Sequence, residues 1–383
     1  MKRFYLDHNA TTSLDPRVLE VMLPWMTSEM MGNPSSVHHE GRKARAAIDF
    51  ARERLASLMK IKPSEIIFSG GGTESNNLAI FGLARAHSAK GRHLITSAGE
   101  HHAVLHAFEY LQKHENFEVT ILPLSPAGSI DPLVLERAIR KETILVSILS
   151  SNNETGVLSP MLEIGAICAK HGIYFHTDAV QSAGKEPLKI KEWQVTAMSL
   201  TGHKFYGPHG TGLLYLKVAT PLQSLHLGGA QENQRRPGTE TVAGIVGFVE
   251  AYAIAQQTCE KESKKLLAMT EELWKGISDL PGVQRNGDPI NRLSNTLNVS
   301  FSKHHGEELL MGLDLAGIAV SSGSACMVGS VQSSHVLQAM GISESTAQST
   351  VRFSMGRKTE ADDIPEIISR IRNVILSQRP LYS

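Results

Sequence analysis

The sequence predicts an α/β protein, with a large domain built on a mostly parallel sheet covered by helices and a smaller α+β domain. Short, uninterrupted apolar runs alternate with amphipathic runs through the first two thirds of the chain. Such runs are typical of parallel strands buried on both faces. From about Thr241 long helical patterns take over, and 383 residues exceed what one core usually holds. We predict residues 13–260 as the large domain, and residues 1–12 with 261–383 as the smaller one.

The individual elements follow from hydrophobic periodicity. A long amphipathic helix is predicted over residues 36–60, where apolar residues recur every three or four positions. The strands of the large domain are predicted at 66–68, 93–96, 117–122, 144–149, 174–176, 197–200 and 212–216. Helices between them are predicted at 101–114, 132–141 and 160–171. A long helix over 241–280 precedes two further strands, at 297–301 and 318–321.

Composition excludes several classes of function. The chain has 38 basic and 38 acidic residues, so nucleic acid and anionic membranes are not expected as partners. No apolar run approaches the roughly 18 residues that span a bilayer, and Asp7 interrupts any signal-peptide core. Three scattered cysteines are too few for a disulfide scaffold. We therefore expect a soluble protein of a reducing compartment, the cytoplasm.

Lys204 is the leading candidate for covalent chemistry. It follows an apolar strand in Ser199-Leu200-Thr201-Gly202-His203-Lys204 and precedes a glycine-rich turn. A lysine in such a setting suits a Schiff base with an aldehyde cofactor, which needs a desolvated amine. The alternative is a lysine that ends a strand, and the other parts of a cofactor site argue against it.

Two further segments supply those parts. Gly70-Gly71-Gly72-Thr73 lies between a strand and a helix, where free backbone N–H groups form an anion site; it matches neither the P-loop nor the dinucleotide spacing, and a plain tight turn is the alternative. Asp178 ends an apolar strand, at the sheet edge where ligands bind. A buried Asp needs a cationic partner, which a pyridinium nitrogen provides; the alternative is an Asp that caps the next helix.

The chain resembles the class V aminotransferase-fold enzymes, and within them the cysteine desulfurases of the NifS/IscS type. The resemblance runs almost end to end. It rests on ordered motifs that include Tyr5-Leu6-Asp7-His8-Asn9-Ala10-Thr11-Thr12, Thr73-Glu74-Ser75-Asn76-Asn77, Glu100-His101, Asn152-Asn153-Glu154-Thr155-Gly156, Asp178-Ala179-Val180-Gln181-Ser182, Gly202-His203-Lys204, Arg236-Pro237-Gly238-Thr239 and Ser321-Ser322-Gly323-Ser324-Ala325-Cys326. It implies a fold-type I transferase that uses pyridoxal 5'-phosphate.

The resemblance also implies a role for each matching residue. Lys204 corresponds to the Schiff-base lysine, His101 to the imidazole stacked on the cofactor ring, Asp178 to the pyridinium partner and Gln181 to the donor to the ring phenolate. The implied phosphate ligands are Gly72, Thr73, Thr201 and His203, with Thr239 reaching the cofactor of the other subunit of a homodimer. Asn153 and Arg352 correspond to the groups that orient the substrate, L-cysteine.

Cys326 corresponds to the catalytic sulfur acceptor. It lies in a Ser/Gly-rich stretch with little apolar periodicity, which predicts an exposed thiol, whereas Cys168 and Cys259 fit inert core positions. The family usually has Thr-Ser after this cysteine and Pro before the Ser-His that follows; here Met327-Val328 and Ser333 stand there. The departure leaves open which protein accepts the sulfur, in iron–sulfur cluster assembly or in thiolation.

Three alternatives remain. A plain class V aminotransferase needs no cysteine loop, and a selenocysteine lyase fits the same residues. A catalytically silent scaffold would be expected to lack Lys204 or Cys326, and both are present. The three adjacent histidine pairs are poor chelates, because neighbours on a helix do not face each other, so no metal site is expected.

Overall fold

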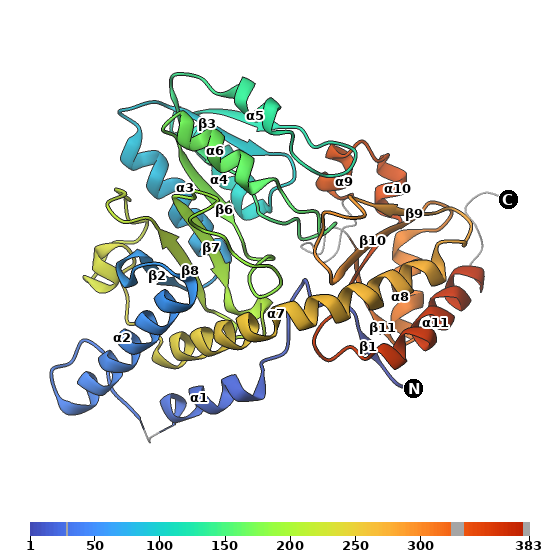
Figure 1. Ribbon diagram of the computed structural model, residues 1–383, viewed down its shortest axis with the longest axis horizontal. Coiled ribbons are helices and arrows are strands. Elements are labelled where there is room, and N and C mark those ends of the chain that lie inside the picture. The colour runs from blue at the N-terminus through green and yellow to red at the C-terminus, as the bar shows by residue number, and fades with distance from the viewer. Residues whose placement is uncertain (28–29, 323–332, 378–383) are drawn as a thin grey trace.

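The computed structural model describes residues 1–27, 30–322 and 333–377 (Figure 1). Its larger part is built on a seven-stranded sheet. The strands, in order across the sheet, are β2 (Ile66–Ser69), β8 (Gly212–Leu216), β7 (Ala197–Thr201), β6 (Tyr174–Asp178), β5 (Thr143–Ser147), β3 (His93–Ser97) and β4 (Glu118–Leu122). β8 runs antiparallel to both neighbours, and the other pairings are parallel. The predicted strands and the mostly parallel sheet are confirmed.

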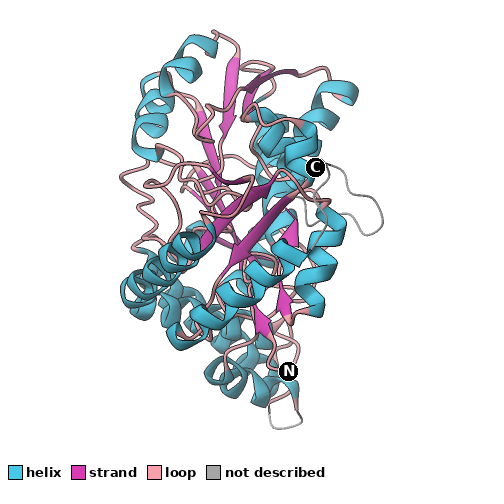
Figure 2. Ribbon diagram, turned by 90° about the vertical axis from the view of Figure 1, so that its right-hand side faces the viewer, coloured by secondary structure: helices cyan, strands magenta, loops and turns pink. Residues whose placement is uncertain are grey.

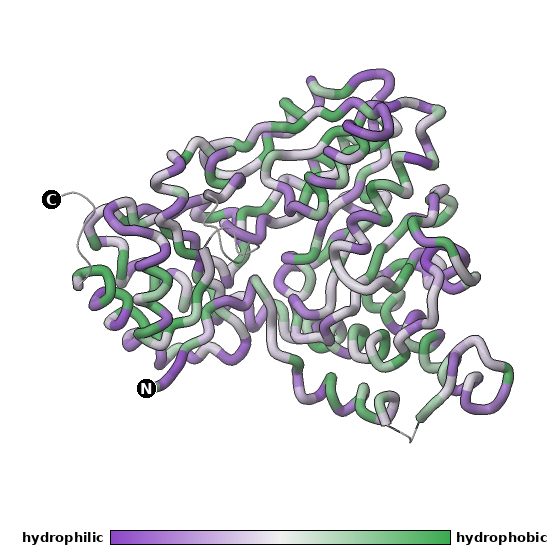
Figure 3. The backbone as a smooth tube through the Cα atoms, turned by 180° about the vertical axis from the view of Figure 1, so that it is seen from behind, coloured by the Kyte–Doolittle hydropathy of each residue, from purple (hydrophilic) through white to green (hydrophobic). Residues whose placement is uncertain are grey.

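Helices cover both faces of this sheet (Figure 2). Successive strand residues point to opposite faces, and each face has its own apolar core. Ile67 and Leu145 pack with α3 (Gly72–His87) and α4 (His102–His114). Phe68 and Val146 pack on the other face, whose core is shared by α2 (His39–Met59), α5 (Pro132–Ala138), α6 (Met161–Lys170) and α7 (Val242–Ile277). α1 (Pro16–Met26) lies against α7. Apart from the edge strand β4, the strands are accordingly buried along nearly their whole length, and hydrophobic and hydrophilic segments alternate along the chain (Figure 3).

The smaller part combines the N-terminus with the last third of the chain. A four-stranded antiparallel sheet has the order β12 (Ser321–Ser322), β13 (Thr350–Ser354), β10 (Thr296–Phe301) and β9 (Val283–Asn286). β1 (Phe4–Tyr5) pairs in parallel with β11 (Ile318–Ala319). The helices of this part are α8 (Gly306–Leu315), α9 (His335–Ala339), α10 (Glu344–Gln348) and α11 (Ile364–Ser377).

One helix joins the two parts. α7 contributes residues up to Ala255 to the core beneath the large sheet and residues from Leu266 onward to a second core. That second core also contains Leu6 from the N-terminal segment and Phe353 from β13. Figure 1 shows α7 running along the lower side of both parts. The start of the chain is therefore held next to its last third, and the segment that follows β1 is placed between the two sheets.

Several predicted boundaries are wrong in detail; the helix predicted over 241–280, for example, ends at Ile277. The strand predicted over 318–321 is two short strands, β11 and β12, which belong to different sheets. The helix predicted over 132–141 ends at Ala138, because Ile139 adopts an extended backbone. The helix predicted over 36–60 is confirmed as α2, which begins after the His38 cap and ends at Lys60 in a left-handed conformation. Among the described residues, no helix has the length and apolar character to cross a membrane.

Candidate active site

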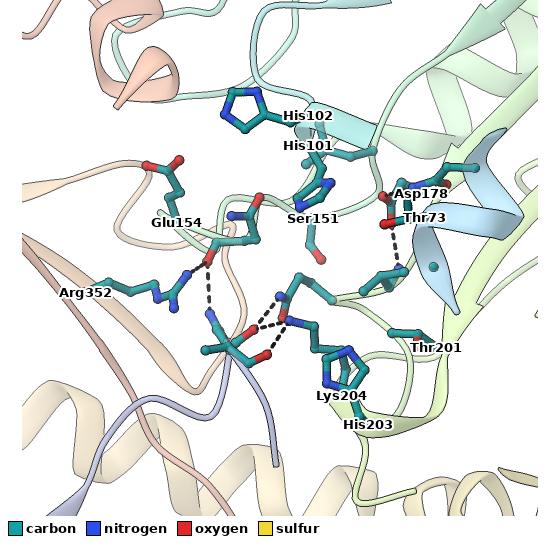
Figure 4. A pocket seen from close by; sticks show the side chains of 18 of the residues that line it. Thr73, His101, His102, Ser151, Glu154, Asp178, Thr201, His203, Lys204 and Arg352 are labelled. Carbon is teal, nitrogen blue, oxygen red and sulfur yellow. Dashed lines mark hydrogen bonds between the residues drawn. The ribbon is translucent and has the colours of Figure 1, made fainter. Parts of the chain in front are cut away.

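A cavity of about 320 Å³ lies where the carboxyl ends of β6 and β7 meet the N-terminal segment and β13. This is the edge of an open α/β sheet at which ligands bind, and its size is at the lower end of ordinary ligand pockets. Ten of the predicted site residues line it (Figure 4): Gly72, Thr73, His101, Asn153, Asp178, Gln181, Thr201, His203, Lys204 and Arg352. The structure therefore brings together residues that span most of the chain.

The N-terminus of α3 forms one wall. The amides of the first helical turn have no partner within a helix, and the helix dipole favours an anion there. Gly71 has φ 156° and ψ 179°, a conformation that favours glycine, and it caps the helix without a side chain in the way. A Cβ on Gly72 would lie 2.8 Å from Val180 Cγ2, so the backbone and the Val180 side chain are closely packed. This wall is suited to a phosphate group.

Asp178 ends β6 and is 8% exposed. Its carboxylate accepts hydrogen bonds from Asn76 Nδ2 at 2.6 Å and from the Val180 amide at 2.9 Å. Both donors are neutral, and a buried carboxylate is most stable when it also faces a cation. Asp178 is thus held rigidly at the cavity wall, ready to pair with a cationic ring nitrogen.

Lys204 lies in a tight turn after β7, with its amino group in the cavity. Its Nζ donates to the carbonyl oxygens of Asn9 at 2.6 Å and Ala10 at 2.8 Å. The turn itself is tied to the N-terminal segment, because the Thr12 hydroxyl donates to the His203 carbonyl at 2.8 Å and accepts from the Tyr206 amide at 2.8 Å. The lysine is therefore placed by contacts between the two ends of the fold.

The two predicted histidines are both electrically neutral near pH 7. His101 caps α4 and its Nδ1 accepts from the Ala103 amide at 3.1 Å, which leaves the ring proton on Nε2. Burial lowers the pKa of His101. Burial, together with nearby Lys204, lowers the pKa of His203 to about 4. His101 points into the cavity in Figure 4, so its neutral ring is able to stack on a ligand.

Arg352 occupies the opposite end of the cavity and is 2% exposed. One Nη donates to Asp7 Oδ1 at 2.7 Å and the other to the Asn153 carbonyl at 3.0 Å. Among the described residues nothing accepts from its buried Nε–H. A guanidinium has five N–H donors, so donors remain for a carboxylate, the group that arginine binds in a two-pronged fashion.

Gln181 is fixed by contacts on two sides. Its Nε2 donates to the Asn9 carbonyl at 2.9 Å, and its Oε1 accepts from Lys185 Nζ at 2.8 Å. Thr201 lies nearby with its hydroxyl donating to the Thr211 carbonyl at 2.9 Å. Each of these side chains keeps hydrogen-bonding capacity for a ligand.

Several cavity residues were not singled out from the sequence. Asn76 lies one helical turn after Gly72, so that helical spacing could have identified it. Glu154 and Asn9 belong to motifs that carried the resemblance, but neither was given a role. Burial raises the pKa of Glu154 to about 7 and that of Glu100, behind the cavity, to about 8. Glu154 accepts a hydrogen bond from Ser334.

Two predicted residues are not placed in this cavity. Thr239 is exposed and lines a separate depression with Glu74 and Arg236, whose side chains form an ion pair at 2.8 Å. Cys326 lies outside the described residues. The other two cysteines are buried free thiols, and burial raises the pKa of Cys168 to about 12. The described residues contain no cluster of His, Cys, Asp and Glu that could hold a metal ion.

A family model described as "Aminotransferase class-V" matches residues 4–367. The chain belongs to this family. It is 45% identical to the cysteine desulfurase IscS of Dictyoglomus turgidum, over all of this chain and 97% of the relative. Among solved structures, a NifS-like protein superposes with a TM-score of 0.92 at 34% identity, covering 98% of this chain and 100% of that one. A structure titled "SspA in complex with cysteine" superposes with a TM-score of 0.82 at 38% identity, covering 92% of this chain and 98% of that one.

The comparisons confirm the predicted family and the fold-type I architecture. Enzymes of this family use pyridoxal 5'-phosphate, and the cavity fits that cofactor. The first turn of α3 matches its phosphate, the Asp178 carboxylate matches its ring nitrogen, and Lys204 supplies an amine for its aldehyde. The predicted cofactor is therefore the one that the family and the donor set both require.

Proposed function

We propose that this protein converts L-cysteine to L-alanine and passes the sulfur, as a persulfide on Cys326, to an acceptor protein. The proposal rests on one observation: a single cavity contains Lys204 and Asp178 at one end and Arg352 at the other. One cavity of about 320 Å³ contains both ends. The relatives named as cysteine desulfurases and the structure titled as a complex with cysteine support the same substrate.

Arg352 and Asn153 orient the substrate in this proposal. Asp7 and the Asn153 carbonyl fix the plane of the guanidinium, so its remaining Nη N–H groups are held in place for a carboxylate before the substrate binds. A group held in place before binding loses little conformational entropy when the substrate arrives. The amino end of the substrate then lies toward Lys204.

The remaining residues handle protons and charge. Bound pyridoxal phosphate supplies an aldehyde that captures the amino group and a ring that accepts the electron pair from Cα. Lys204 takes the Cα proton as a general base. Asp178 keeps the ring nitrogen protonated, Gln181 donates to the ring oxygen, and Gly72, Thr73, Thr201 and His203 hold the phosphate.

Sulfur transfer completes the reaction. The Cys326 thiolate forms an S–S bond to the substrate sulfur as the C–S bond breaks, and a proton replaces sulfur on the substrate carbon. Cysteine and a thiol thus become alanine and a persulfide. The described residues on either side of the segment that contains Cys326 contact residues that line the cavity: Ser321 pairs with Arg352, and Ser334 donates to Glu154.

We further propose that the protein is cytoplasmic and that it forms a homodimer with shared sites. Sharing would give a role to Thr239, which is exposed and absent from its own cavity. The acceptor in this proposal belongs to iron–sulfur cluster assembly or thiolation. Mixing Lys204→Ala and Thr239→Ala subunits tests the shared site. Mixed dimers should regain activity that neither parent has, and no gain over the parents would contradict sharing.

Measuring the products formed from L-cysteine tests the activity itself. With L-cysteine and dithiothreitol, alanine and sulfide should form in equal amounts, and Cys326→Ser should abolish both while the cofactor spectrum still responds to cysteine. Cys168→Ser is the matched control and should behave as the wild type. Full alanine formation by Cys326→Ser would favour a selenocysteine lyase, and amino transfer to a keto acid without sulfide would favour an aminotransferase.

A further inference from the structure

Lys185 is a lysine whose amino group is turned inward next to the active site. It follows β6, keeps part of its surface exposed, and directs its Nζ to two acceptors, Gln181 Oε1 at 2.8 Å and Asn9 Oδ1 at 3.2 Å. Both acceptors are neutral amide oxygens. Lysines usually keep the amino group in water, and giving up that hydration without a carboxylate partner carries a cost. Lys185 lies outside the motifs that carried the resemblance.

The contact determines which way the Gln181 amide faces. An amide has an accepting end and a donating end, and lysine can hold the accepting end. With Oε1 directed to Lys185, Nε2 faces the cavity side, where one N–H donates to the Asn9 carbonyl at 2.9 Å. The same carbonyl accepts from Lys204 at 2.6 Å, as Figure 4 shows at the Lys204 end. The second N–H of Gln181 remains for the ligand.

Asn9 extends the same arrangement to the substrate end. Its Oδ1 accepts from Lys185 and from Asn295 Nδ2 at 3.0 Å. Its Nδ2 therefore faces the other way and donates to Thr296 Oγ1 at 2.8 Å and to the Asn153 carbonyl at 3.3 Å. That carbonyl also accepts from Arg352. One amino group thus contacts two amides that connect the lysine end of the cavity to the arginine end, and for Gln181 it is the donor that holds Oε1.

Lys185 is surrounded by several charged and titratable groups. The pKa of Lys185 is lowered well below its usual value, mainly by removal from water and also by the positive charges of Lys204 and Arg352. His8 and His203 also face it, and their pKa values are lowered to about 4, so both are neutral. The Glu262 carboxylate, on the far wall of the adjoining small cavity, is paired with Arg357 at 2.6 Å.

We propose that Lys185 is a positioning residue that holds the Gln181 N–H toward the cofactor and thereby sets the proton affinity of the cofactor joined to Lys204. The proposal rests on the proposed function, because it takes Gln181 as the donor to the ring oxygen. A donor to that oxygen weakens its hold on the proton shared with the Lys204 nitrogen. Losing Lys185 leaves Gln181 Oε1 without the donor that anchors it, so the N–H is no longer held toward the cofactor and the proton is retained to higher pH.

The test is a pH titration of the visible absorbance of the holoenzyme without substrate. In Lys185→Met the midpoint should rise by about one pH unit, a tenfold change in proton affinity. Lys189→Met removes an exposed lysine from the same segment, paired with Glu192 at 3.6 Å, and should leave the midpoint unchanged. A merely structural role would lower the melting temperature of Lys185→Met without moving the midpoint.

A double-mutant cycle shows whether the effect passes through Gln181. Adding Lys185→Met to Gln181→Ala should move the midpoint by less than about 0.3 unit, because coupled residues are not additive. An unchanged midpoint in Lys185→Met, or full additivity in the cycle, overturns the proposal. If Lys185→Met does not fold, Lys185→Gln, which keeps an N–H donor on a shorter chain, should show a smaller rise, and no rise there also overturns it. A wild type without a visible band would instead overturn the proposed function.

Discussion

Replacement of Arg352 by lysine tests how the cavity recognises an amino acid. The guanidinium uses two of its five N–H groups on Asp7 and the Asn153 carbonyl, which leaves one further N–H on each Nη besides the buried Nε–H. A carboxylate can take two of these as charged hydrogen bonds, each contributing about 1.5–3 kcal/mol. Lysine keeps the charge but loses the second prong. We expect a loss of about 2 kcal/mol, or roughly 30-fold in kcat/KM.

The assay is alanine formation as a function of L-cysteine concentration, with the cysteine-dependent change in cofactor absorbance as an independent measure of binding. Most of the loss should be in KM. Arg292→Lys is the matched control: Arg292 is also buried, also has a buried Nε–H without a partner among the described residues, and pairs with Glu271 outside the cavity. It should lower the melting temperature and leave KM within about twofold. If Arg352→Lys keeps kcat/KM within threefold of the wild type, Arg352 does not bind the substrate carboxylate.

Three further predictions concern the lysine end and the buried acids. Lys204→Ala should retain the cofactor through the phosphate and Asp178 contacts but lose turnover, and borohydride reduction of the wild type should label Lys204; a label on another lysine would disprove the assignment. Asp178→Asn should bind the cofactor and react at least about 100-fold more slowly, because an amide does not keep the ring nitrogen protonated; wild-type turnover would remove that role. Glu154 has a pKa raised from 4.5 to about 7, so the wild type should lose stability as pH rises through that window, by up to about 3 kcal/mol. The stabilisation of Glu154→Gln over the wild type should therefore be larger at pH 8 than at pH 5 in thermal melts, and an equal difference at both pH values would contradict the buried-acid interpretation.

Local sequence patterns were enough to predict the helices that bury a regular apolar stripe and the strands that are short buried segments. α2 follows its apolar spacing, and β6 and β7 are short runs that are buried along nearly their whole length. The break between β11 and β12 could not be predicted in this way. Ile318 and Ala319 pair with β1, whereas Ser321 pairs with β13, so the boundary depends on strands more than 300 and about 30 residues away in sequence, respectively. Partners so distant leave no local signal.

The site also contains residues that local sequence could identify and residues that only distant contacts reveal. Lys204 and Asp178 stand at the ends of recognisable strands, so position relative to an element pointed to them. Asp7 fixes Arg352 across nearly the whole chain, and Asn9 joins the two ends of the cavity only because β1 packs in the smaller part. Lys185 resembles a solvated lysine in sequence, and its inward contacts emerge only from the tertiary structure.

The fate of the substrate sulfur is the most direct test of the proposed desulfurase activity. After a brief incubation of the wild type with L-cysteine, mass spectrometry of non-reduced peptides should show one added sulfur on the peptide that contains Cys326, removable by dithiothreitol. The peptides that contain Cys168 and Cys259 should be unchanged, because both thiols are buried and burial raises the pKa of each. Added sulfur on Cys168 or Cys259, or alanine formation with no sulfur on Cys326, would contradict the account.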